Sequence, residues 1–202
     1  MIIKILKEEG YTESLLGMSL SYYDHEEDLD DWWDEDKIAR AVRRSKALAP
    51  KDGGHNKFLE SIQVWVYIQA ARHFWQEFDT YRVGTTKQSA STMHTLDKRP
   101  VTEDDFELGT SRIMITAFNQ VLAAYKNPTS PYYKDITYLK DNLPEGWLQE
   151  RVVCTNYKVL RHIISQRENH RLLYWKIFCN EIIQQITHPE LLVTTLENKN
   201  DK

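Results

Sequence analysis

A strict alternation of apolar and polar side chains over residues 62–69 is the feature that most constrains the fold of this chain. The apolar positions are Ile62, Val64, Val66 and Ile68, and the positions between them are Gln63, Trp65, Tyr67 and Gln69. Successive side chains of a β-strand point to opposite faces, so this pattern predicts a strand that buries one face in a hydrophobic core. A core strand is therefore expected in the first half of the chain.

Apolar residues at helical spacing lie on both sides of this strand. The predicted helices lie near residues 13–22, 36–48, 58–62, 70–78 and 113–125, with two more between 157 and 186. The other predicted strands lie at residues 2–6 and 147–154. Residues 80–93 are rich in Thr, Ser and Gly and are expected to form a loop. Strands and helices mixed in this way predict an α+β fold.

The predicted helix near residues 113–125 has the clearest apolar face. Its members are Ile113, Ala117, Phe118, Val121, Leu122 and Tyr125. The helix is expected to end at Asn127-Pro128, because proline cannot continue the helical hydrogen bonds.

Length and composition predict one domain over residues 1–195, followed by a disordered polar tail at 196–202. No signal peptide and no membrane span are expected, and the mean hydropathy is −0.59. Cys154 and Cys179 follow apolar residues, which favours small buried side chains in a reducing cytosol. A pI near 6.0 argues against direct nucleic-acid binding, which usually needs a domain pI above about 9.

The acidic segment 24–37 stands apart from the rest of the chain. It holds nine acidic residues and one Lys, a sum of −8, which leaves +4 for the remainder of a chain whose net charge is −4. Calcium-loop spacing is absent, so no metal site is expected there. The segment is either a solvated loop or, through Trp32-Trp33, a docking site for a basic protein partner.

Known nucleophile and phosphate-loop motifs are missing, so no catalytic residue is assigned. The loop over residues 80–94 nevertheless offers hydroxyls, backbone N–H groups and two cations, which are the groups that bind phosphate. A solvated Ser/Thr loop is the alternative interpretation.

A second candidate anion site lies near the end of the helix that follows Asn156. Leu160, Ile163 and Ile164 form an apolar stripe that Arg167 and Arg171 are expected to extend. Arg151, Arg167 and His170 are therefore candidate anion ligands. Pairing of these arginines with the acidic loops is the alternative.

The stretch from Gly54 to Ala70 resembles one known family. It holds Gly54-His55, then Glu60, then Ile62 and the alternating strand, an order similar to that of the flavin-dependent thymidylate synthases. Further on, Leu143-Pro144, Leu148-Gln149-Glu150-Arg151, Asn156 and Arg167 are similar to the family's Leu-Pro, Tyr-Thr-Arg, Asn-x-Arg and helix-ending Arg. The resemblance covers residues 55–186 and is that of a diverged member, of a kind similar to those of bacteriophages.

The family's signature, R-H-R-x-x-S-x-N-E-x-S-x-R, falls on the loop in one of two registers. Without a gap, Arg82 repeats the opening triplet, Thr85 replaces the first Ser, Lys87-Gln88 replaces Asn-Glu and Thr92 replaces the closing Arg. A one-residue insertion instead places Gln88, Ser89 and Ser91 on the Asn, Glu and Ser, and Met93 on the closing Arg. Both registers stay open.

The resemblance implies a mostly antiparallel sheet flanked by helices, and FAD bound between subunits of a homotetramer. The cofactor-binding residues that it implies are His55, Arg82, Thr85, Thr86 and Asn156. The implied residues for a dUMP-like pyrimidine nucleotide are Gln88, Ser89, Ser91, Arg151 and Arg167. Reduced flavin would pass hydride to the base, with NADPH and methylenetetrahydrofolate as co-substrates.

Two functions follow as hypotheses. The first is reductive methylation, or a related modification, of a pyrimidine nucleotide in the cytoplasm, which is the bacterial host's if a phage encodes the chain. The second is a catalytically inactive relative that binds a nucleotide or a protein, with a regulatory or anti-defence role in a phage. The second hypothesis arises because neither register keeps the signature's Glu and closing Arg.

Overall fold

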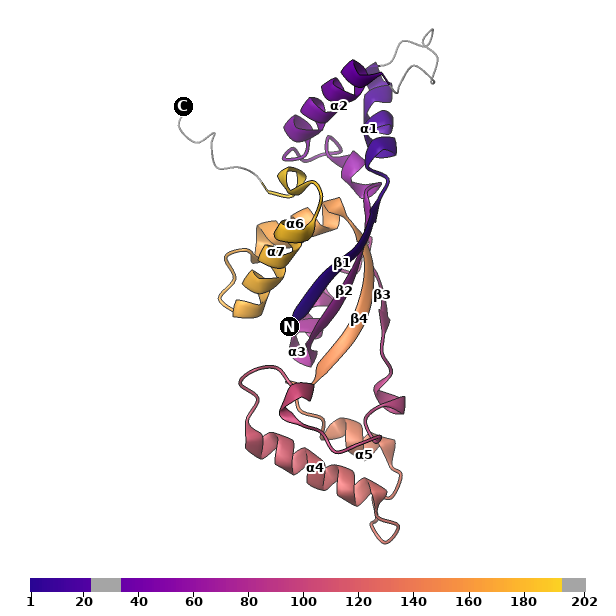
Figure 1. Cartoon of the computed structure of the whole chain (residues 1–202), viewed down its shortest axis with the longest axis vertical. Coiled ribbons are helices and arrows are strands. Elements are labelled where there is room, and N and C mark those ends of the chain that lie inside the picture. The colour runs from indigo at the N-terminus through magenta and orange to yellow at the C-terminus, as the bar shows by residue number, and fades with distance from the viewer. Residues whose placement is uncertain (23–33, 194–202) are drawn as a thin grey trace. The chain divides into compact units, whose positions relative to one another are not determined.

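The computed structural model describes residues 1–22 and 34–193 (Figure 1). Trp32-Trp33, most of the acidic segment and the tail at 196–202 fall outside these residues, so the predictions about them are not addressed. Contacts within the chain divide it into two compact units. Unit 1 comprises residues 1–2, 68–80 and 88–152, and unit 2 comprises residues 3–67, 81–87 and those from 153 onward. That residues 1–195 act as one domain stays a prediction.

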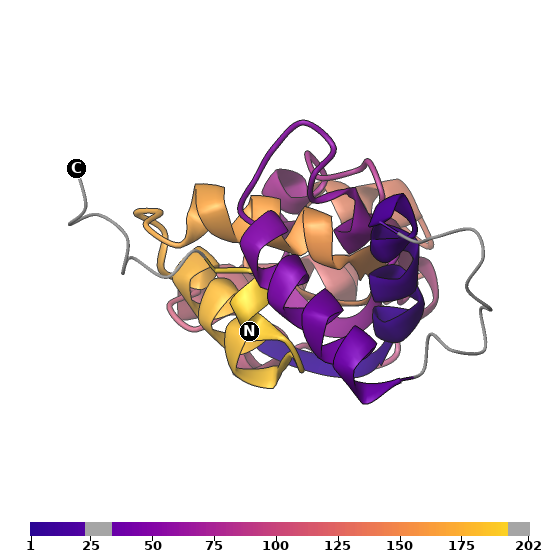
Figure 2. The ribbon, with the colours of Figure 1, turned by 90° about the horizontal axis from the view of Figure 1, so that it is seen from above.

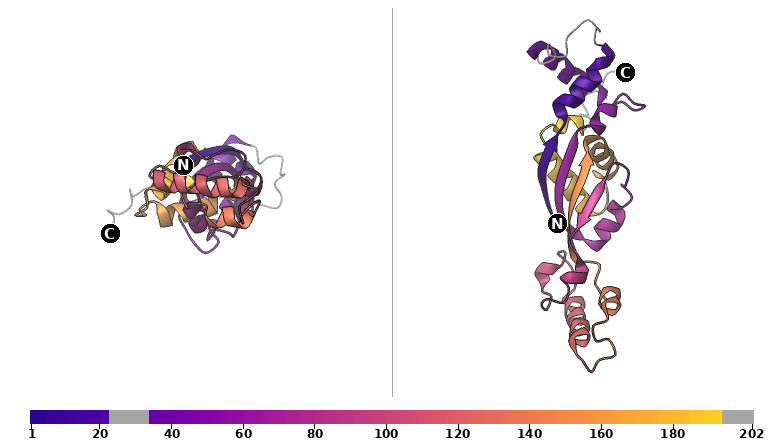
Figure 3. Two further views of the ribbon diagram at one scale, coloured as in Figure 1. Left: turned by 90° about the horizontal axis from the view of Figure 1, so that it is seen from below. Right: turned by 90° about the vertical axis from the view of Figure 1, so that its right-hand side faces the viewer.

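Four strands form one antiparallel sheet, which confirms the predicted α+β class. They are β1 (Ile2–Glu9), β2 (Gln63–Ala71), β3 (Thr86–Ser89) and β4 (Leu148–Asn156). The order across the sheet is β1-β2-β4-β3 (Figure 3, right). The predicted alternation of buried and less buried side chains is confirmed, because Val64, Val66, Ile68 and Ala70 are fully buried while the residues between them are only half-buried.

Strand β3 was not expected, because the sequence predicts a loop over residues 80–93. Its four residues show no apolar alternation, since β3 is an edge strand with mostly exposed side chains. Backbone pairing with β4 holds this part of the chain, and just beyond β3 the Ala90 N–H donates to the Glu150 carbonyl at 3.0 Å. Hydrogen bonding to a neighbouring strand, which local composition does not encode, therefore makes this segment a strand.

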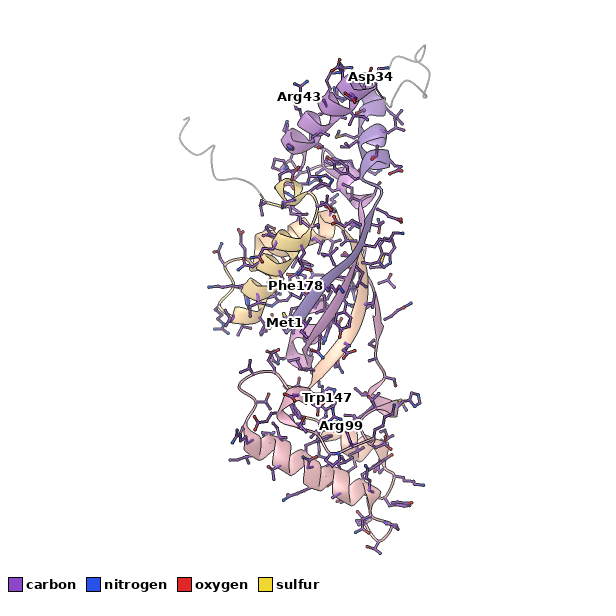
Figure 4. The ribbon with its side chains drawn as sticks, viewed as in Figure 1. Met1, Asp34, Arg43, Arg99, Trp147 and Phe178 are labelled. Atoms are coloured by element: carbon purple, nitrogen blue, oxygen red, sulfur yellow. The ribbon has the colours of Figure 1, made fainter. Side chains whose placement is uncertain are left out.

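Unit 2 contains four α-helices among its described residues. They are α1 (Tyr11–Ser19), α2 (Glu35–Leu48), α6 (Tyr157–Arg167) and α7 (Leu173–Gln185), with short 3₁₀ turns at Leu20–Tyr22, Lys57–Glu60 and Pro189–Leu191. Helices α1 and α2 contact each other through a small apolar cluster that includes Leu15 and Ala41 (Figure 2). Asp34 caps α2 by accepting bonds from the Asp36 and Lys37 N–H groups (Figure 4). The buried residues of α6 and α7 are Tyr157, Leu160, Ile163, Ile164, Trp175, Phe178, Cys179 and Ile182.

Unit 1 contains three α-helices, α3 (Arg72–Phe78), α4 (Arg112–Lys126) and α5 (Ile136–Asp141), with 3₁₀ turns at Thr92–His94 and Glu103–Asp105. Its apolar core comprises Leu96, Val101, Phe106, Ile115, Phe118, Leu122, Leu139 and Leu143. The short helix α5 was not expected from the sequence. Asp135 caps the helix, because its carboxylate accepts bonds from the Thr137 and Tyr138 N–H groups, and Leu139 is the buried residue of α5.

Helix α4 ends where the sequence predicts, but its buried face differs from the predicted one. Ile113 is 79% exposed and Ala117 is also exposed, whereas Ile115, Phe118 and Leu122 are buried. Apolar residues occur on more than one side of this helix, so the spacing alone could not identify the side that faces the core.

The two cysteines differ in burial. Cys179 is buried in α7, and burial raises the pKa of its thiol to about 12. Cys154 is only half-buried in β4. The prediction of a small buried side chain is therefore confirmed for Cys179 alone. Among the described helices, none is long and apolar enough to cross a bilayer.

Two glycines of unit 2 offer a matched test of this local structure. Gly10 has a φ of +86°, and a Cβ there would lie 2.5 Å from the Ser61 carbonyl oxygen. We expect Gly10→Ala to lower the free energy of unfolding by about 2 kcal/mol, because it adds both backbone strain and a clash.

In contrast, a Cβ on Gly17, inside α1, meets nothing within 4 Å. Gly17→Ala should stabilise the protein by about 0.5–1 kcal/mol in urea unfolding followed by circular dichroism. Equal effects of the two substitutions would contradict this structure.

Candidate functional site

The ten residues predicted to bind cofactor or substrate divide between the two units. Unit 2 holds His55, Arg82, Thr85, Thr86, Asn156 and Arg167, and unit 1 holds Gln88, Ser89, Ser91 and Arg151. The predicted site residues therefore form two groups, one in each unit.

Arg167 is held at the end of α6 in unit 2 by aromatic side chains. Its guanidinium carbon lies 4.6 Å from the centroid of the Trp175 ring, and its Nε donates to the Tyr81 hydroxyl at 2.7 Å. The Tyr81 hydroxyl in turn donates to Gln166 Oε1 at 2.9 Å. Attraction between the cation and the ring faces fixes the guanidinium where the apolar stripe of α6 ends. The predicted extension of this stripe to Arg167 is confirmed.

Arg171 does not extend the stripe, contrary to the sequence prediction. Helix α6 ends at Arg167, so the helical spacing that would align Arg171 with the stripe no longer applies. Arg171 is exposed. His170, in contrast, lies beside Arg167, because its Nε2 is 3.1 Å from Nη1 of that arginine.

Asn156 has a clear structural role at the start of α6. It is 7% exposed, and its side-chain oxygen accepts a bond from the Val159 N–H at 3.0 Å, which caps the helix. The chain passes close by at Gly84, whose φ is +69° and where a Cβ would lie 3.0 Å from Asn156 Nδ2. A glycine is therefore required for this turn to approach the cap.

The predicted flavin contacts next to this turn differ in accessibility. The Thr85 hydroxyl lies 3.2 Å from that of Thr155, which also donates to the Gly84 carbonyl at 3.3 Å. Arg82 and Thr86 are exposed. Among residues 1–22 and 34–193, the Arg82 side chain has no ion-pair or hydrogen-bond partner. The turn thus presents a cation and a hydroxyl to solvent.

His55 lies elsewhere in unit 2. It lines a cavity of about 440 Å³ together with Glu13, Ser21, Lys57 and Phe58. Within the described part of the chain, no hydrogen bond or ion pair joins His55 to the other predicted flavin contacts. The structure therefore does not bring His55 into one bonded cluster with Arg82, Thr85 and Thr86.

Arg151, which belongs to unit 1, also lies over an aromatic ring. Its guanidinium carbon is 4.2 Å from the centroid of the Trp75 ring. Nη2 donates to Gln149 Oε1 at 3.1 Å, and Nη1 lies 3.4 Å from Asp79 Oδ1. Burial lowers the pKa of Arg151, and the Asp79 carboxylate opposes that shift. Its Nε is buried and has no partner within the described residues.

The three remaining predicted substrate contacts follow one another along the chain in unit 1. Gln88 and Ser89 belong to β3, Ser91 precedes the 3₁₀ turn at Thr92–His94, and all three are exposed. The Ser91 carbonyl accepts a bond from the Thr95 hydroxyl at 2.8 Å. These positions present hydroxyl and amide groups to solvent but no charge.

A cavity of about 570 Å³ in unit 1 was not predicted from the sequence. Its lining includes Ala90, Thr92, Lys98, Arg99, Trp147 and Glu150. Arg99 and Trp147 are labelled in Figure 4. Arg99 is engaged by both carboxylate oxygens of Asp105, at 2.6 and 2.7 Å. Gln69 donates to Glu150 at 3.3 Å. No motif marks these residues, because they come from segments far apart in the sequence. Among the described residues, no group of three or more His, Cys, Asp or Glu could hold a metal ion.

No protein-family model and no curated protein sequence matches this chain. Solved structures do match. Two crystal structures of thymidylate synthase ThyX from Helicobacter pylori with FAD and dUMP each give a TM-score of 0.72 over 95% of this chain. The matched regions cover 98% and 97% of the two ThyX chains, and the sequence identities are 13% and 12%.

The chain has the fold of a flavin-dependent thymidylate synthase. The fold that the sequence resemblance implies is thereby confirmed over nearly the whole chain. Identity this low shows the fold and not the ligands, because many functions occur on one fold. The roles of the ten predicted site residues stay predictions.

Substitutions at Asn156 test whether its main role is to cap α6. Asn156→Ala should cost about 1 kcal/mol of stability, because the Val159 N–H loses its partner. Asn156→Asp keeps an accepting oxygen and adds a favourable negative charge at the helix N-terminus, so it should leave stability unchanged or higher. Thermal unfolding followed by circular dichroism distinguishes these outcomes. Equal losses in both variants would mean that the side-chain N–H₂ group, and not the cap, holds this region.

Proposed function

We propose that the protein binds FAD and a dUMP-like pyrimidine nucleotide and modifies the base by flavin chemistry. The observation that carries the proposal is the agreement in fold, over 95% of this chain, with two structures of a thymidylate synthase bound to FAD and dUMP. The order of Gly54-His55, Arg82, Arg151 and Arg167 along the sequence supports it independently.

The residues of the Arg82–Thr86 turn fit the pyrophosphate of FAD. An anion of this kind needs a cation and hydroxyl or backbone donors in an accessible position. Arg82 and Thr86 are exposed, and Gly84 between them has a positive φ and no side chain of its own. Bound FAD would supply hydride transfer, which side chains cannot provide. NADPH and methylenetetrahydrofolate would then be the reductant and the carbon donor.

Arg167 and Arg151 suit the nucleotide because both are held in place before any ligand arrives. Arginine binds phosphate in a bidentate manner, and a side chain already fixed on a ring loses less conformational entropy on binding. The amide of Gln88 and the hydroxyls of Ser89 and Ser91, which belong to the same unit as Arg151, would add neutral donors. We propose that these five residues bind the nucleotide.

Exposure of the predicted contacts favours a site completed by other copies of the chain. Arg82, Thr86, Gln88, Ser89 and Ser91 are all exposed. A ligand held by these groups needs a further surface to exclude water from it. We therefore include a homo-oligomer, a tetramer by resemblance to the family, in the proposal, and we place it in the cytoplasm.

A second candidate function, nucleotide binding without flavin chemistry, is favoured by the neutral character of the signature loop. Depending on the register, Gln88 or Ser89 stands where the family has its Glu, and Thr92 or Met93 stands where it has its closing Arg. Each charge-assisted hydrogen bond lost in this way weakens binding by roughly 1.5–3 kcal/mol. A regulatory protein that binds a nucleotide, or docks a partner through Trp32-Trp33, would tolerate that loss.

Flavin retention tests the first proposal. We expect purified protein, incubated with FAD and desalted, to keep a visible flavin absorbance band. Arg82→Ala should weaken FAD binding about tenfold or more, through loss of a charge-assisted bond to phosphate. Arg43→Ala, which removes an exposed cation from α2, is the matched control and should bind FAD normally. A protein that never retains FAD, yet still binds dUMP, would favour the second candidate.

Titration calorimetry with dUMP tests the nucleotide site. Arg167→Met should weaken binding by about tenfold or more, because it removes a bidentate phosphate donor. Arg171→Met removes an exposed cation from outside the ring cluster and should have little effect. Circular dichroism establishes that both variants fold. Equal affinities for dUMP in both variants would exclude Arg167 as a ligand.

A further inference from the structure

The cavity of about 570 Å³ in unit 1 is lined by residues other than the ten that were predicted to bind FAD or a pyrimidine nucleotide. They come from the end of β2, from the segment 90–105, and from Trp147 and the beginning of β4. The volume lies within the range of roughly 300–1,000 Å³ that is typical of small-molecule sites. The cavity is therefore a candidate site for a further ligand.

The charges that line this cavity do not favour a phosphate. Arg99 donates to both carboxylate oxygens of Asp105, at 2.7 and 2.6 Å, so its charge is already paired. The other charged residues of the lining are one cation, Lys98, and two acids, Asp104 and Glu150. A surface with more acidic than basic groups repels an anion. A ligand of this cavity therefore needs groups that donate hydrogen bonds to a carboxylate.

Glu150 offers a carboxylate that can accept further hydrogen bonds. Its Oε1 accepts a bond from Gln69 Nε2 at 3.3 Å, which joins side chains of the adjacent strands β2 and β4. Among residues 1–22 and 34–193, its Oε2 has no hydrogen-bond or ion-pair partner. An ionised carboxylate accepts up to about four hydrogen bonds. Both oxygens of Glu150 are therefore able to accept from a ligand that presents two parallel N–H groups.

Trp147 supplies the flat apolar surface that a planar ligand needs. Its ring is half-buried and makes an edge contact with Phe106, with 5.5 Å between the centroids and 82° between the planes. Leu96, Val101 and Leu148 add aliphatic side chains to the lining of the cavity. Heterocycles stack on aromatic side chains of this kind whatever substituents they carry. The cavity thus combines a surface for a ring with a carboxylate for the edge of that ring.

The two oxygens of Glu150 favour one kind of ring edge. A carboxylate pairs best with two neighbouring N–H donors, because both of its oxygens then accept a bond. The 2-amino-4-oxopyrimidine ring that guanine and the pterins share presents a ring N–H beside an amino group. In contrast, adenine presents a donor beside an acceptor, and uracil presents one donor between two acceptors. An acceptor that faces a carboxylate is repelled, so adenine and uracil fit this site less well.

We propose that this cavity binds a 2-amino-4-oxopyrimidine ring, with Glu150 accepting from its ring N–H and amino groups and Trp147 stacking on its face. The carbonyl oxygen of such a ring needs a donor, and the exposed Lys98 lines the same cavity. Guanine nucleotides and folates both carry this ring. The site uses none of the residues proposed to bind FAD or the pyrimidine nucleotide, so the inference goes beyond the proposed function. Its folate case would give the site of the carbon donor named there, and in that case the inference rests on the proposed function.

Titration calorimetry with guanosine and inosine tests the recognition of the ring. Inosine differs from guanosine only by lacking the 2-amino group, and neither nucleoside carries a phosphate that Arg151 or Arg167 could bind. Guanosine should bind about tenfold or more tightly than inosine, because inosine leaves one oxygen of Glu150 without a partner. Equal measurable affinities for the two nucleosides would overturn the proposal, as would the absence of binding by both guanosine and folic acid.

Substitution of Glu150 tests which residue recognises the ring. Glu150→Gln places an amide N–H₂ group against the donors of the ring, so it should weaken guanosine binding at least about tenfold and remove the preference over inosine. Asp141→Asn removes an equal charge from an exposed position of α5, outside the cavity, and should leave binding unchanged. Circular dichroism establishes that both variants fold. Unchanged binding in Glu150→Gln would exclude Glu150 as the ligand of the ring and overturn the proposal.

Folic acid distinguishes the two sources of the ring. Binding of folic acid in preference to guanosine, lost in Glu150→Gln, would identify the ligand as a folate. The opposite preference, also lost in Glu150→Gln, would identify it as a guanine nucleotide, and both results support the site. None of these measurements requires bound FAD or dUMP, so a failure here is distinguishable from a failure of the proposed function.

Discussion

Burial of one face of β2 is the constraint on which the rest of the structure depends. Val64 and Val66 belong to unit 2, and Ile68 and Ala70 belong to unit 1, so a single strand supplies buried side chains to both. Strand β2 also lies between β1 and β4, which satisfy its backbone hydrogen bonds on both sides. A one-residue shift in its register would turn every one of these side chains to the opposite face.

Both units hold an arginine on an aromatic ring, and this interaction is the basis of the candidate site. Arg151 lies over Trp75 in unit 1, and Arg167 lies over Trp175 in unit 2. The ring attracts the guanidinium while the surrounding side chains limit its motion. A cation held in this way is ready to bind an anion, although the same contacts also stabilise the fold when no ligand is present.

The exposed polar side chains of residues 88–91 are the part of the candidate site that the core constrains least. Residues 88–91 lie on an edge strand and the turn after it, where side chains have little effect on the core. Substitutions there would change exposed groups and have little effect on the core. The exposed side chains of α4 likewise lie outside the core of unit 1, to which this helix contributes Ile115, Phe118 and Leu122.

The sequence alone determined the elements whose pattern reflects their own burial. These include the alternating strand, the stripe of α6 that ends at Arg167 and the end of α4 at Asn127, together with the resemblance that named the fold. Periodicity and chain-terminating residues act over a few positions, so a single sequence contains enough information to predict them.

Only the tertiary structure decided the features that depend on distant segments. Strand β3 exists because β4 bonds to it, and the side of α4 that faces the core depends on what surrounds that helix. The residue types of the candidate site could be predicted, but not the contact between Arg167 and Tyr81, which are 86 positions apart. The prediction that Arg171 extends the apolar stripe was wrong because α6 ends at Arg167, so the helical spacing does not continue to Arg171. Local patterns specify which side chains can be buried, whereas contacts between distant segments decide which ones meet.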